Sequence, residues 1–277
     1  MHKEDSLSVT SANIHDLGSA LRTLRGALAR RILFAVVVLA AARTAAAGPY
    51  SPAPPAGSDA VSASDPAIVE WASGYQDYEL GSPANPSYEN PSESLGAFKN
   101  SVADVTNLGE GGQITYTFAE PIVAGTSGFD FAVFGNGFES TYEKLAFVYV
   151  SANGVNWYEM PNYDLTPGPV GTYGTTDPTN IYGLAGKYQL GYGVGYNLSE
   201  VGLASASYVK IVDVVGNGST FDSAGDPIYS PYPNDLGFNV DAIGVMSAAP
   251  EPGTLVLLSV GLVLLGAARG LRRFRRA

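Results

Sequence analysis

Oxygen-bearing side chains recur in and just after the strands that the sequence predicts, and they are the first candidates for chemistry. Asp130 and Asp241 lie inside predicted strands beside apolar neighbours, where an unpaired charge is costly unless it meets a cation or several donors. Calcium takes about six to eight oxygens from carboxylates, amides and backbone carbonyls. We therefore predict one structural Ca²⁺ site, with ligands from the set Asp130, Asn136, Asp213, Asp226 and Asp241.

The same acids have a simpler interpretation as turn-forming and solubilising residues, which is what Asp and Asn usually are in loops. No loop of the D-x-[DN]-x-[DN]-G type is present to favour calcium. The sequence leaves both interpretations open.

Tyrosines form the second candidate set, and all 17 of them lie between residues 48 and 249. An exposed tyrosine offers a sugar ring a flat apolar face and a polar tip. The residues predicted to stack on a glycan are Tyr192, Tyr196, Tyr229 and Tyr232. Packing over the edge of the fold is the alternative for these loop residues. Trp157 alternates inside a predicted strand and is expected in the core.

Charge and composition exclude several kinds of function. Residues 48–249 hold 22 of the 26 acidic residues but four of the 15 basic ones, all of them lysine, so their formal net charge is −18. The lack of arginine there argues against binding of phosphate or nucleic acid. The chain has no cysteine, and its two histidines are His2 and His15. Residues 48–249 therefore contain no disulfide, Cys/His zinc site or Ser-His-Asp triad.

An enzyme built from these residues would have to use carboxylates alone. A glycoside hydrolase acting on a matrix polysaccharide works with two carboxylates about 5 to 10 Å apart. No spacing in the sequence selects such a pair. A carboxylate-dependent glycoside hydrolase is therefore the alternative to a non-catalytic protein.

Short strands must position these residues. Ile114, Tyr116 and Phe118 alternate with polar neighbours, so one face of that strand is buried. Asn153-Gly154 predicts a type I′ hairpin turn with positive φ at both residues, which makes the strands around it antiparallel neighbours. The predicted fold class is all-β, an antiparallel β-sandwich of jelly-roll type. Its strands are expected at residues 111–118, 129–134, 145–150, 155–159, 208–215 and 238–245.

Three stretches lack regular strand signals. Residues 48–66 are rich in Pro, Ala and Ser, which is typical of a linker. Residues 73–99 and 160–197 alternate turn residues with aromatics and predict long loops. The sandwich is expected to be one domain at residues 67–247, which is long enough for a hydrophobic core without disulfides.

Residues 1–47 have the order of a secretory signal peptide with a long n-region. Arginines precede an apolar stretch at residues 32–42, and Ala45-Ala46-Ala47 supplies small residues at the cleavage positions. Export by the Sec machinery is expected, and an uncleaved N-terminal anchor is the alternative.

Residues 248–277 contain Pro250, Glu251 and Pro252, then an apolar run, then a cluster of arginines. A hydrocarbon core about 30 Å thick needs about 17 to 25 helical residues, so residues 253–271 are expected to span a membrane as a helix. Arginines stay on the cytoplasmic side, which places the preceding chain outside. An ordinary C-terminal membrane anchor is the alternative.

This tripartite tail resembles the PEP-CTERM sorting signal of Gram-negative bacteria. The resemblance implies that an exosortase, a membrane protease-transpeptidase, recognises the tail and cuts near Pro250-Glu251-Pro252. The protein would be anchored in the membrane transiently and then reach the outer surface or the extracellular matrix.

Residues 48–249, which we call the body, are similar to a family of secreted bacterial surface proteins that often carry such tails. The resemblance implies a jelly roll like that of carbohydrate-binding modules and no defined enzymatic role. This sequence departs from the family at Gly135, where an acidic or amide residue is usual, and at Asn153 and Asn239, where Asp is usual. The matching stretches are LGA at 95–97, LGEGGQI at 108–114, FDFAVFGNGF at 129–138, VSANGVNW at 150–157, GLAGK at 183–187, GDPIY at 225–229 and GFNVDAI at 237–243.

Together these features predict a secreted, surface-sorted, non-catalytic protein of the cell envelope or exopolysaccharide matrix. It is expected to bind a glycan, with calcium as a stabilising ion. A structural matrix protein without a specific ligand is the remaining alternative.

Overall fold

The computed structural model describes residues 47–55, 58–139, 141–233 and 236–247. The predicted signal peptide up to residue 46 and the predicted sorting tail, including Pro250, Glu251, Pro252 and the helix at 253–271, lie outside these residues. Within the described ranges, no helix is long and apolar enough to cross a membrane. Regular structure there consists of 15 strands and three short 3₁₀ helices, η1 (Pro86–Tyr88), η2 (Pro178–Asn180) and η3 (Leu198–Val201).

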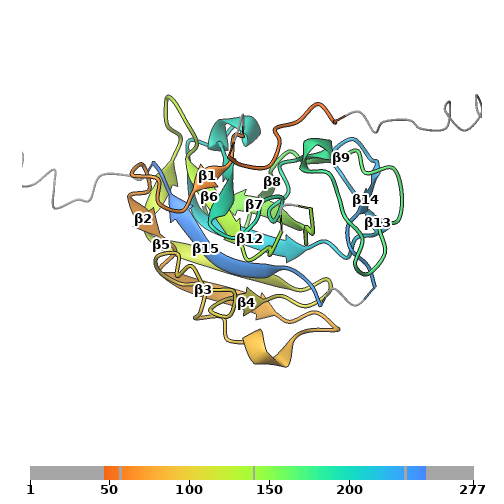
Figure 1. Cartoon of the computed structure of the whole chain (residues 1–277). Helices are drawn as coiled ribbons and strands as arrows, with labels where there is room; N and C mark the ends of the chain where they lie inside the picture. The colour runs from red at the N-terminus through yellow and green to blue at the C-terminus, as the bar shows by residue number, and fades with distance from the viewer. Residues whose placement is uncertain (1–46, 56–57, 140, 234–235, 248–277) are drawn as a thin grey trace, which may run out of the picture. The chain divides into compact units, whose positions relative to one another are not determined.

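Six strands form the sheet that we call sheet A. Their order is β1-β11-β6-β15-β2, β4 also pairs with β15, and every pair is antiparallel. The central strand β6 is buried along its whole length. The strands are β1 (Val61–Ser62), β2 (Glu70–Trp71), β4 (Thr106–Asn107), β6 (Phe131–Gly135), β11 (Tyr192–Tyr196) and β15 (Asn239–Val245), as drawn in Figure 1.

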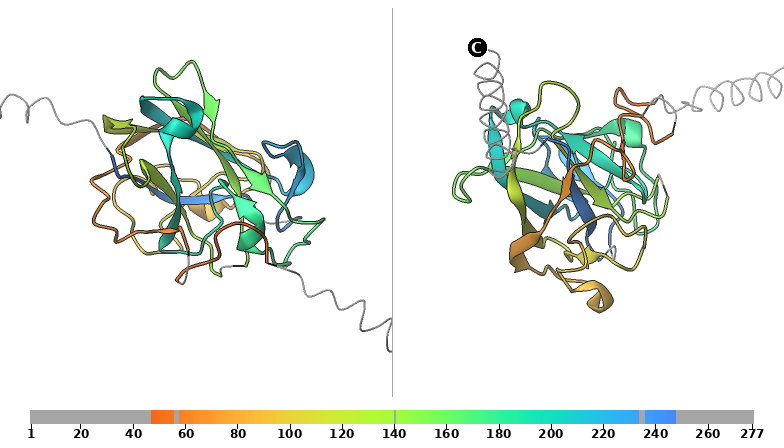
Figure 2. Two further views of the ribbon diagram at one scale, coloured as in Figure 1. Left: turned by 90° about the horizontal axis from the view of Figure 1, so that it is seen from above. Right: turned by 90° about the vertical axis from the view of Figure 1, so that its left-hand side faces the viewer.

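Five strands form the second sheet, sheet B, in the antiparallel order β3-β5-β12-β7-β8. They are β3 (Gly74–Glu79), β5 (Gln113–Val123), β12 (Ser205–Asp213), β7 (Ala146–Ser151) and β8 (Tyr158–Glu159). Two small ribbons complete the body: β9 (Tyr163–Asp164) with β10 (Ile181–Tyr182), and β13 (Asn217–Phe221) with β14 (Pro227–Tyr229). Figure 1 places β13 and β14 at the end far from β2, and Figure 2 shows the long loops between strands.

The main hydrophobic core lies between the two sheets. Alternate residues of sheet B, such as Ile114 and Tyr116 in β5 and Val209 in β12, are fully buried with Phe131 and Ile243 of sheet A. Complete burial of an aliphatic or aromatic side chain contributes about 1.5–3 kcal/mol. The predicted all-β, antiparallel sandwich is therefore confirmed.

Four strands lie where the sequence predicted loops. β3 falls inside residues 73–99, and β9, β10 and β11 fall inside residues 160–197, so the loop prediction was wrong in both stretches. In β11 the reason is packing, because a Cβ atom on Gly193 would lie 2.9 Å from the ring of Phe134 in β6. Gly195 has the same relation to the ring of Phe129. Gly193 and Gly195 leave space for these rings, and because glycine has no side chain, the strand lacks the alternation of apolar residues that would have predicted it. In addition, β1 lies within residues 48–66, so sheet A begins earlier than composition indicates.

The predicted hairpin has the right partners and a different turn. β7 and β8 are antiparallel neighbours, as expected. However, β7 ends at Ser151, β8 begins at Tyr158, and of the pair Asn153-Gly154 only Gly154 has a positive φ, of 70°. The Oδ1 atom of Asn153 accepts the N–H of Val155 at 2.9 Å. Side-chain hydrogen bonds thus shape a wider loop at residues 152–157 in place of a type I′ turn.

Sheet A has an apolar outer face that other segments cover. The rings of Trp71 and Phe98 lie 5.7 and 5.8 Å from the ring of Phe134, and Ala132 and Ala242 belong to the same cluster. This face is therefore closed to solvent.

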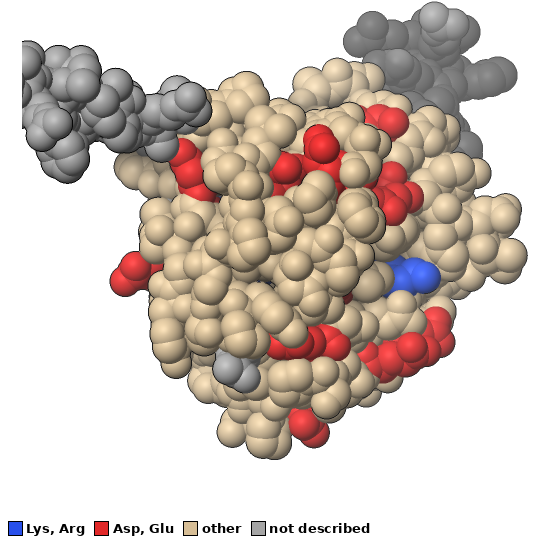
Figure 3. Space-filling view, turned by 90° about the vertical axis from the view of Figure 1, so that its right-hand side faces the viewer, with Lys and Arg blue, Asp and Glu red and all other residues tan. Residues whose placement is uncertain are grey.

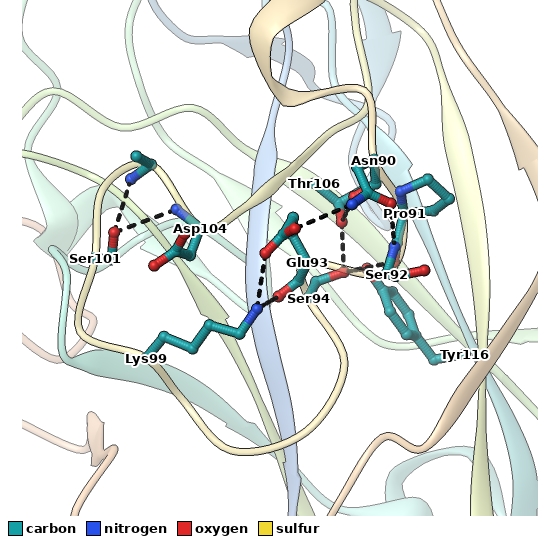
Figure 4. A network of polar contacts seen from close by, with 11 residues as sticks. Asn90, Pro91, Ser92, Glu93, Ser94, Lys99, Ser101, Asp104, Thr106 and Tyr116 are labelled. Carbon is teal, nitrogen blue, oxygen red and sulfur yellow. Dashed lines mark hydrogen bonds and ion pairs between the residues drawn. The ribbon is translucent and has the colours of Figure 1, made fainter.

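A polar network anchors the segment that carries Phe98. The Oγ atom of Ser94 lies 2.6 Å from both the Tyr116 hydroxyl and Thr106 Oγ1, deep below the surface (Figure 4). The Lys99 ammonium donates to Glu93 Oε2 at 2.9 Å nearer the surface (Figure 4). The segment is thus attached to sheet B through Tyr116 while it covers sheet A.

Buried aspartates tie loops to strands. The two oxygens of Asp130 accept the backbone N–H groups of Gly125 and Leu198, both at 2.7 Å. Those of Asp213 accept the N–H groups of Gly111 at 2.8 Å and Phe238 at 2.6 Å. Hydrogen bonds to a charged group are stronger than neutral ones and satisfy both partners in the interior.

The same arrangement joins the two ribbons. Asp164 of β9 accepts the N–H of Tyr229 in β14 at 2.8 Å, and the N–H of Asp164 donates to Asp222 at 2.9 Å. Asp222 also accepts the N–H of Ala224 at 2.9 Å. We refer to Asp130, Asp164, Asp213 and Asp222 as the bridging aspartates.

Replacement of a bridging aspartate should destabilise the fold. In Asp130→Asn the amide can accept one of the two N–H groups, and the charge is lost. A hydrogen bond to a charged group contributes about 1.5–3 kcal/mol, and about 1 kcal/mol shifts Tm by about 2–4 °C in a domain of this size. We expect Tm to fall by roughly 5 °C or more in thermal unfolding followed by circular dichroism.

The matched control is Asp226→Asn, because the Asp226 side chain is exposed and makes no hydrogen bond to a described residue. Its Tm should not change. An equal Tm for both variants would contradict the bridging role.

Candidate functional site

Strand register places five side chains in one row across the outer face of sheet B. Gln76 pairs with Thr115, Lys210 pairs with both Thr115 and Tyr149, and Tyr149 pairs with Glu159. Lys210 alternates with core residues along β12, so the row points away from the main core. Thr115 is buried, with 1% exposure, so the amide of Gln76, the ammonium of Lys210, the phenol of Tyr149 and the carboxylate of Glu159 are the groups of this row that can offer donors and acceptors at the surface.

Aromatic rings surround the lysine of this row. The Lys210 Nζ atom lies 4.2 Å from the centroid of the Trp157 ring and 5.8 Å from that of Tyr149. Trp157 meets the ring of Tyr208 edge-on at 6.3 Å. These separations are within the range of cation–π and aromatic pairing. We call Tyr149, Trp157, Tyr208 and Lys210 the aromatic platform, and all four side chains are partly exposed.

The prediction that Trp157 lies in the core was wrong. Only Tyr158 and Glu159 of the predicted strand at 155–159 form β8. Trp157 lies in the loop before it, where strand alternation does not apply, and its ring meets Lys210 on the outer face. The half-buried indole is therefore available at the surface.

The ammonium of Lys210 has N–H donors available for a ligand. It forms no ion pair with any residue in the described part of the chain. The acid at the end of the row, Glu159, is engaged with Tyr149. Burial raises the pKa of Tyr149, and the hydrogen bond and charge of Glu159 raise it further. The Tyr149 hydroxyl therefore stays protonated at neutral pH as a donor.

Part of the outer face of sheet B is closed. Phe147 and Val212, next to the row, pack with Leu184 and with Ile181 of β10 and Ile228 of β14. The two ribbons thus border the platform at one side. On another side the loop before β8 and the start of β8 are exposed, with Val155 at 77% and Tyr158 at 42% exposure. The aromatic platform is therefore open to solvent on that side, and its geometry suits a ring-shaped ligand with hydroxyl groups.

The four tyrosines predicted to stack on a glycan do not form one surface. Tyr196 is 2% exposed, and its ring stacks on Phe131 at 5.1 Å inside the core. Tyr192, also in β11, is half-buried, whereas Tyr229 lies on β14 and Tyr232 follows it. Stacking by Tyr192, Tyr229 and Tyr232 stays a prediction.

The residues predicted to bind calcium are likewise separated. Asp130 and Asp213 use both oxygens as bridging aspartates, and Asp226 is exposed. Asn136 donates its amide to the carbonyl of Val102 at 3.0 Å. Within the described ranges, no group of three or more His, Cys, Asp or Glu side chains could hold a metal ion. This arrangement does not fit one shared site. Calcium binding stays a prediction, which thermal unfolding in Ca²⁺ and in EDTA tests.

Asp241, the fifth predicted ligand, is a buried acid without a hydrogen bond of normal geometry. It is 2% exposed and lies at a β-bulge in β15, and neither oxygen makes a hydrogen bond of normal geometry, although the backbone N–H of Lys99 is near enough to lower its pKa. Burial raises its pKa to about 7, Lys99 opposes the rise, and Asp104 adds to it.

Glu143 is similar, since its Oε1 atom has no partner and its Oε2 atom accepts the Thr176 hydroxyl at 2.5 Å. Burial raises the pKa of Glu143 to about 8, against the lowering effects of Thr176 and Lys187.

Acidic side chains are spread over the surface as well. Figure 3 shows many of them on one face, with little basic surface among them. This distribution agrees with the net charge of −18 for residues 48–249. Long-range repulsion therefore disfavours polyanionic ligands and self-association.

Sequence reasoning missed the platform, although part of its signal was present. Tyr208, Lys210 and Val212 alternate with Val209 and Ile211, which is the period of a strand with one exposed face. What the sequence did not show is the register that brings β7 and the loop before β8 beside these residues.

The two buried acids Asp241 and Glu143 should make stability depend on pH. The folded protein retains their protons up to about pH 7 to 8, whereas the unfolded chain releases them near pH 4. The folded state then binds more protons, so the free energy of unfolding falls as pH rises through this window. We expect Tm to decrease from about pH 5 to about pH 8, and the decrease to be smaller in Asp241→Asn combined with Glu143→Gln.

Thermal unfolding at several pH values measures this effect. Glu89→Gln, at an exposed position, is the control and should retain the pH dependence of the unmodified protein. If the double variant showed the same slope as the control, these two acids would not be the cause.

Comparison with known proteins gives a distant likeness among solved structures. No protein-family model and no curated protein matches the chain. Among solved structures, a pectin-binding carbohydrate-binding module is similar to it, with a TM-score of 0.36 and 10% sequence identity. The match covers 66% of this chain and 96% of that chain. At this distance the likeness identifies no functional residue, so the site rests on the geometry above.

Proposed function

We propose that the protein is a non-catalytic glycan-binding component of the cell envelope or exopolysaccharide matrix, and that the aromatic platform is its binding surface. The supporting observation is the set of partly exposed rings around Lys210, which has no ion-pair partner in the described part of the chain. Aromatic rings stack on the apolar face of a sugar, and the ammonium and the row beside it hydrogen-bond to hydroxyl groups.

The ligand class is a neutral polysaccharide. The strong negative charge of residues 48–249 repels polyanions at long range. Hydroxyl groups, in contrast, match the exposed or partly exposed Gln76, Lys210 and Glu159 of the row. An open sheet face fits a polymer chain better than it fits a small, enclosed ligand.

The two ends of the chain support the proposed location of the protein. Residues 1–47 favour export through the Sec machinery, and residues 248–277 favour processing by an exosortase after transient insertion of residues 253–271 into the membrane. The destination would be the outer surface or matrix of a Gram-negative bacterium. Replacing Pro250, Glu251 and Pro252 by alanine, followed by fractionation of the cells, tests this location.

Loss of the indole should weaken binding. We expect Trp157→Ala to reduce affinity about 10-fold, since an aromatic contact contributes about 0.5–1.5 kcal/mol beyond its buried area. Affinity gels with galactomannan, xyloglucan or hydroxyethylcellulose measure retention of the full-length protein. Tyr173→Ala is the matched control, because Tyr173 is 88% exposed and lies outside the platform.

Equal retention of Trp157→Ala and Tyr173→Ala would contradict the platform. Release of new reducing ends from the retained polysaccharide, measured on the same samples, would contradict the non-catalytic role and favour a glycoside hydrolase. We expect no release.

A further inference from the structure

A concave site lies beside β11 in sheet A, apart from the open aromatic platform. It is formed where residues 182–188, the helix η3 and the N-terminal segment around Asp59 come together. The residues that matter for its chemistry are Asp59, Phe129, Tyr182, Lys187, Tyr188 and Glu200. We call it the rim cleft, and it shares no residue with the aromatic platform.

Lys187 is the unusual residue of the rim cleft. It is 2% exposed, and it makes no hydrogen bond or ion pair with a residue in the described part of the chain. Its ammonium lies 5.0 Å from the centroid of the Tyr188 ring. Burial lowers the pKa of Lys187, while the nearby acids Asp59 and Glu143 oppose the decrease. An ammonium has three N–H donors, so this one needs acceptors that a ligand can supply.

Asp59 is near enough to Lys187 to raise its pKa, and Glu200 lines the same cleft. The Tyr188 hydroxyl donates to the carboxylate of Asp59, and the Tyr182 hydroxyl donates to Glu200 at 3.4 Å. A carboxylate has about four acceptor sites, so each keeps capacity after one bond from a tyrosine. A donor beside an oriented acceptor matches a pair of adjacent hydroxyl groups.

Size and surroundings limit the ligand. The volume of the rim cleft is about 30 Å³, which is the space of a hydroxyl or hydroxymethyl group and not of a whole sugar ring. The ring of Tyr182, which lines the cleft, lies 5.5 Å from that of Tyr50 and 6.0 Å from that of Tyr163. These rings can cover the apolar face of a sugar whose hydroxyl groups enter the cleft.

We propose that the rim cleft is a second glycan site, which binds the terminal residue of a neutral polysaccharide between the Lys187 ammonium and the Asp59 carboxylate. The ligand class rests on the proposed function, whereas the position and the residues do not. The aromatic platform would bind the interior of one polysaccharide and the rim cleft the end of another, so one protein molecule would connect two polysaccharides.

Variants of the two sites separate the two proposals. Asp59→Asn changes an exposed side chain, and Asp65→Asn, in the same segment but outside the cleft, is its matched control. Lys187→Met removes the ammonium and keeps an apolar stem, and its Tm shows whether it folds. Each full-length variant is titrated calorimetrically with mannotetraose and cellotetraose. Each is also mixed with galactomannan or xyloglucan for light scattering, which reports cross-linking.

We expect Asp59→Asn to lower the affinity for the oligosaccharides about 10-fold and to abolish cross-linking, with retention on the affinity gel within about 2-fold of the control. Oligosaccharide affinity and scattering equal to the control in both Asp59→Asn and Lys187→Met would overturn the cleft and leave the platform intact. Loss of retention in Asp59→Asn, with none in Trp157→Ala, would support the cleft and overturn the platform.

Discussion

The fold depends on hydrogen bonds from backbone N–H groups to buried aspartate carboxylates. The body has no cysteine and no arginine, so neither disulfides nor guanidinium groups can hold its long loops. Asp213 instead joins the loop before β5 to the residue that precedes β15, and Asp130 joins the loop after β5 to η3. These bonds satisfy charges and N–H groups that would otherwise be costly to bury.

With the loops held, the two sheets acquire different outer faces. Trp71 and Phe98 close the face of sheet A, because the segment that carries Phe98 is anchored through Ser94 to Tyr116 of the core. The outer face of sheet B is closed beside the ribbons and at the buried Thr115. Trp157 and Lys210 therefore remain at the surface, and the same packing that stabilises the fold selects the face that can meet a ligand.

Acidic residues have three roles in this body. The bridging aspartates support the fold, Asp241 and Glu143 are buried with unpaired oxygens, and the exposed acids give the surface its negative charge. A negatively charged protein stays soluble among other polymers and avoids polyanions. The proposed neutral glycans are compatible with that charge and with the donors and acceptors of the platform and the rim cleft.

Composition and periodicity by themselves determined the fold class, the positions of strands such as β6 and β15, and the exclusion of disulfide, zinc and triad chemistry. They did so because strand alternation and residue counts are local properties. The sites depended on tertiary structure. Register across five strands assembled the row around Lys210, packing of Phe134 against glycines concealed β11, and distant N–H groups occupied Asp130 and Asp213. Such relations join residues far apart in the chain, so no local pattern contains them.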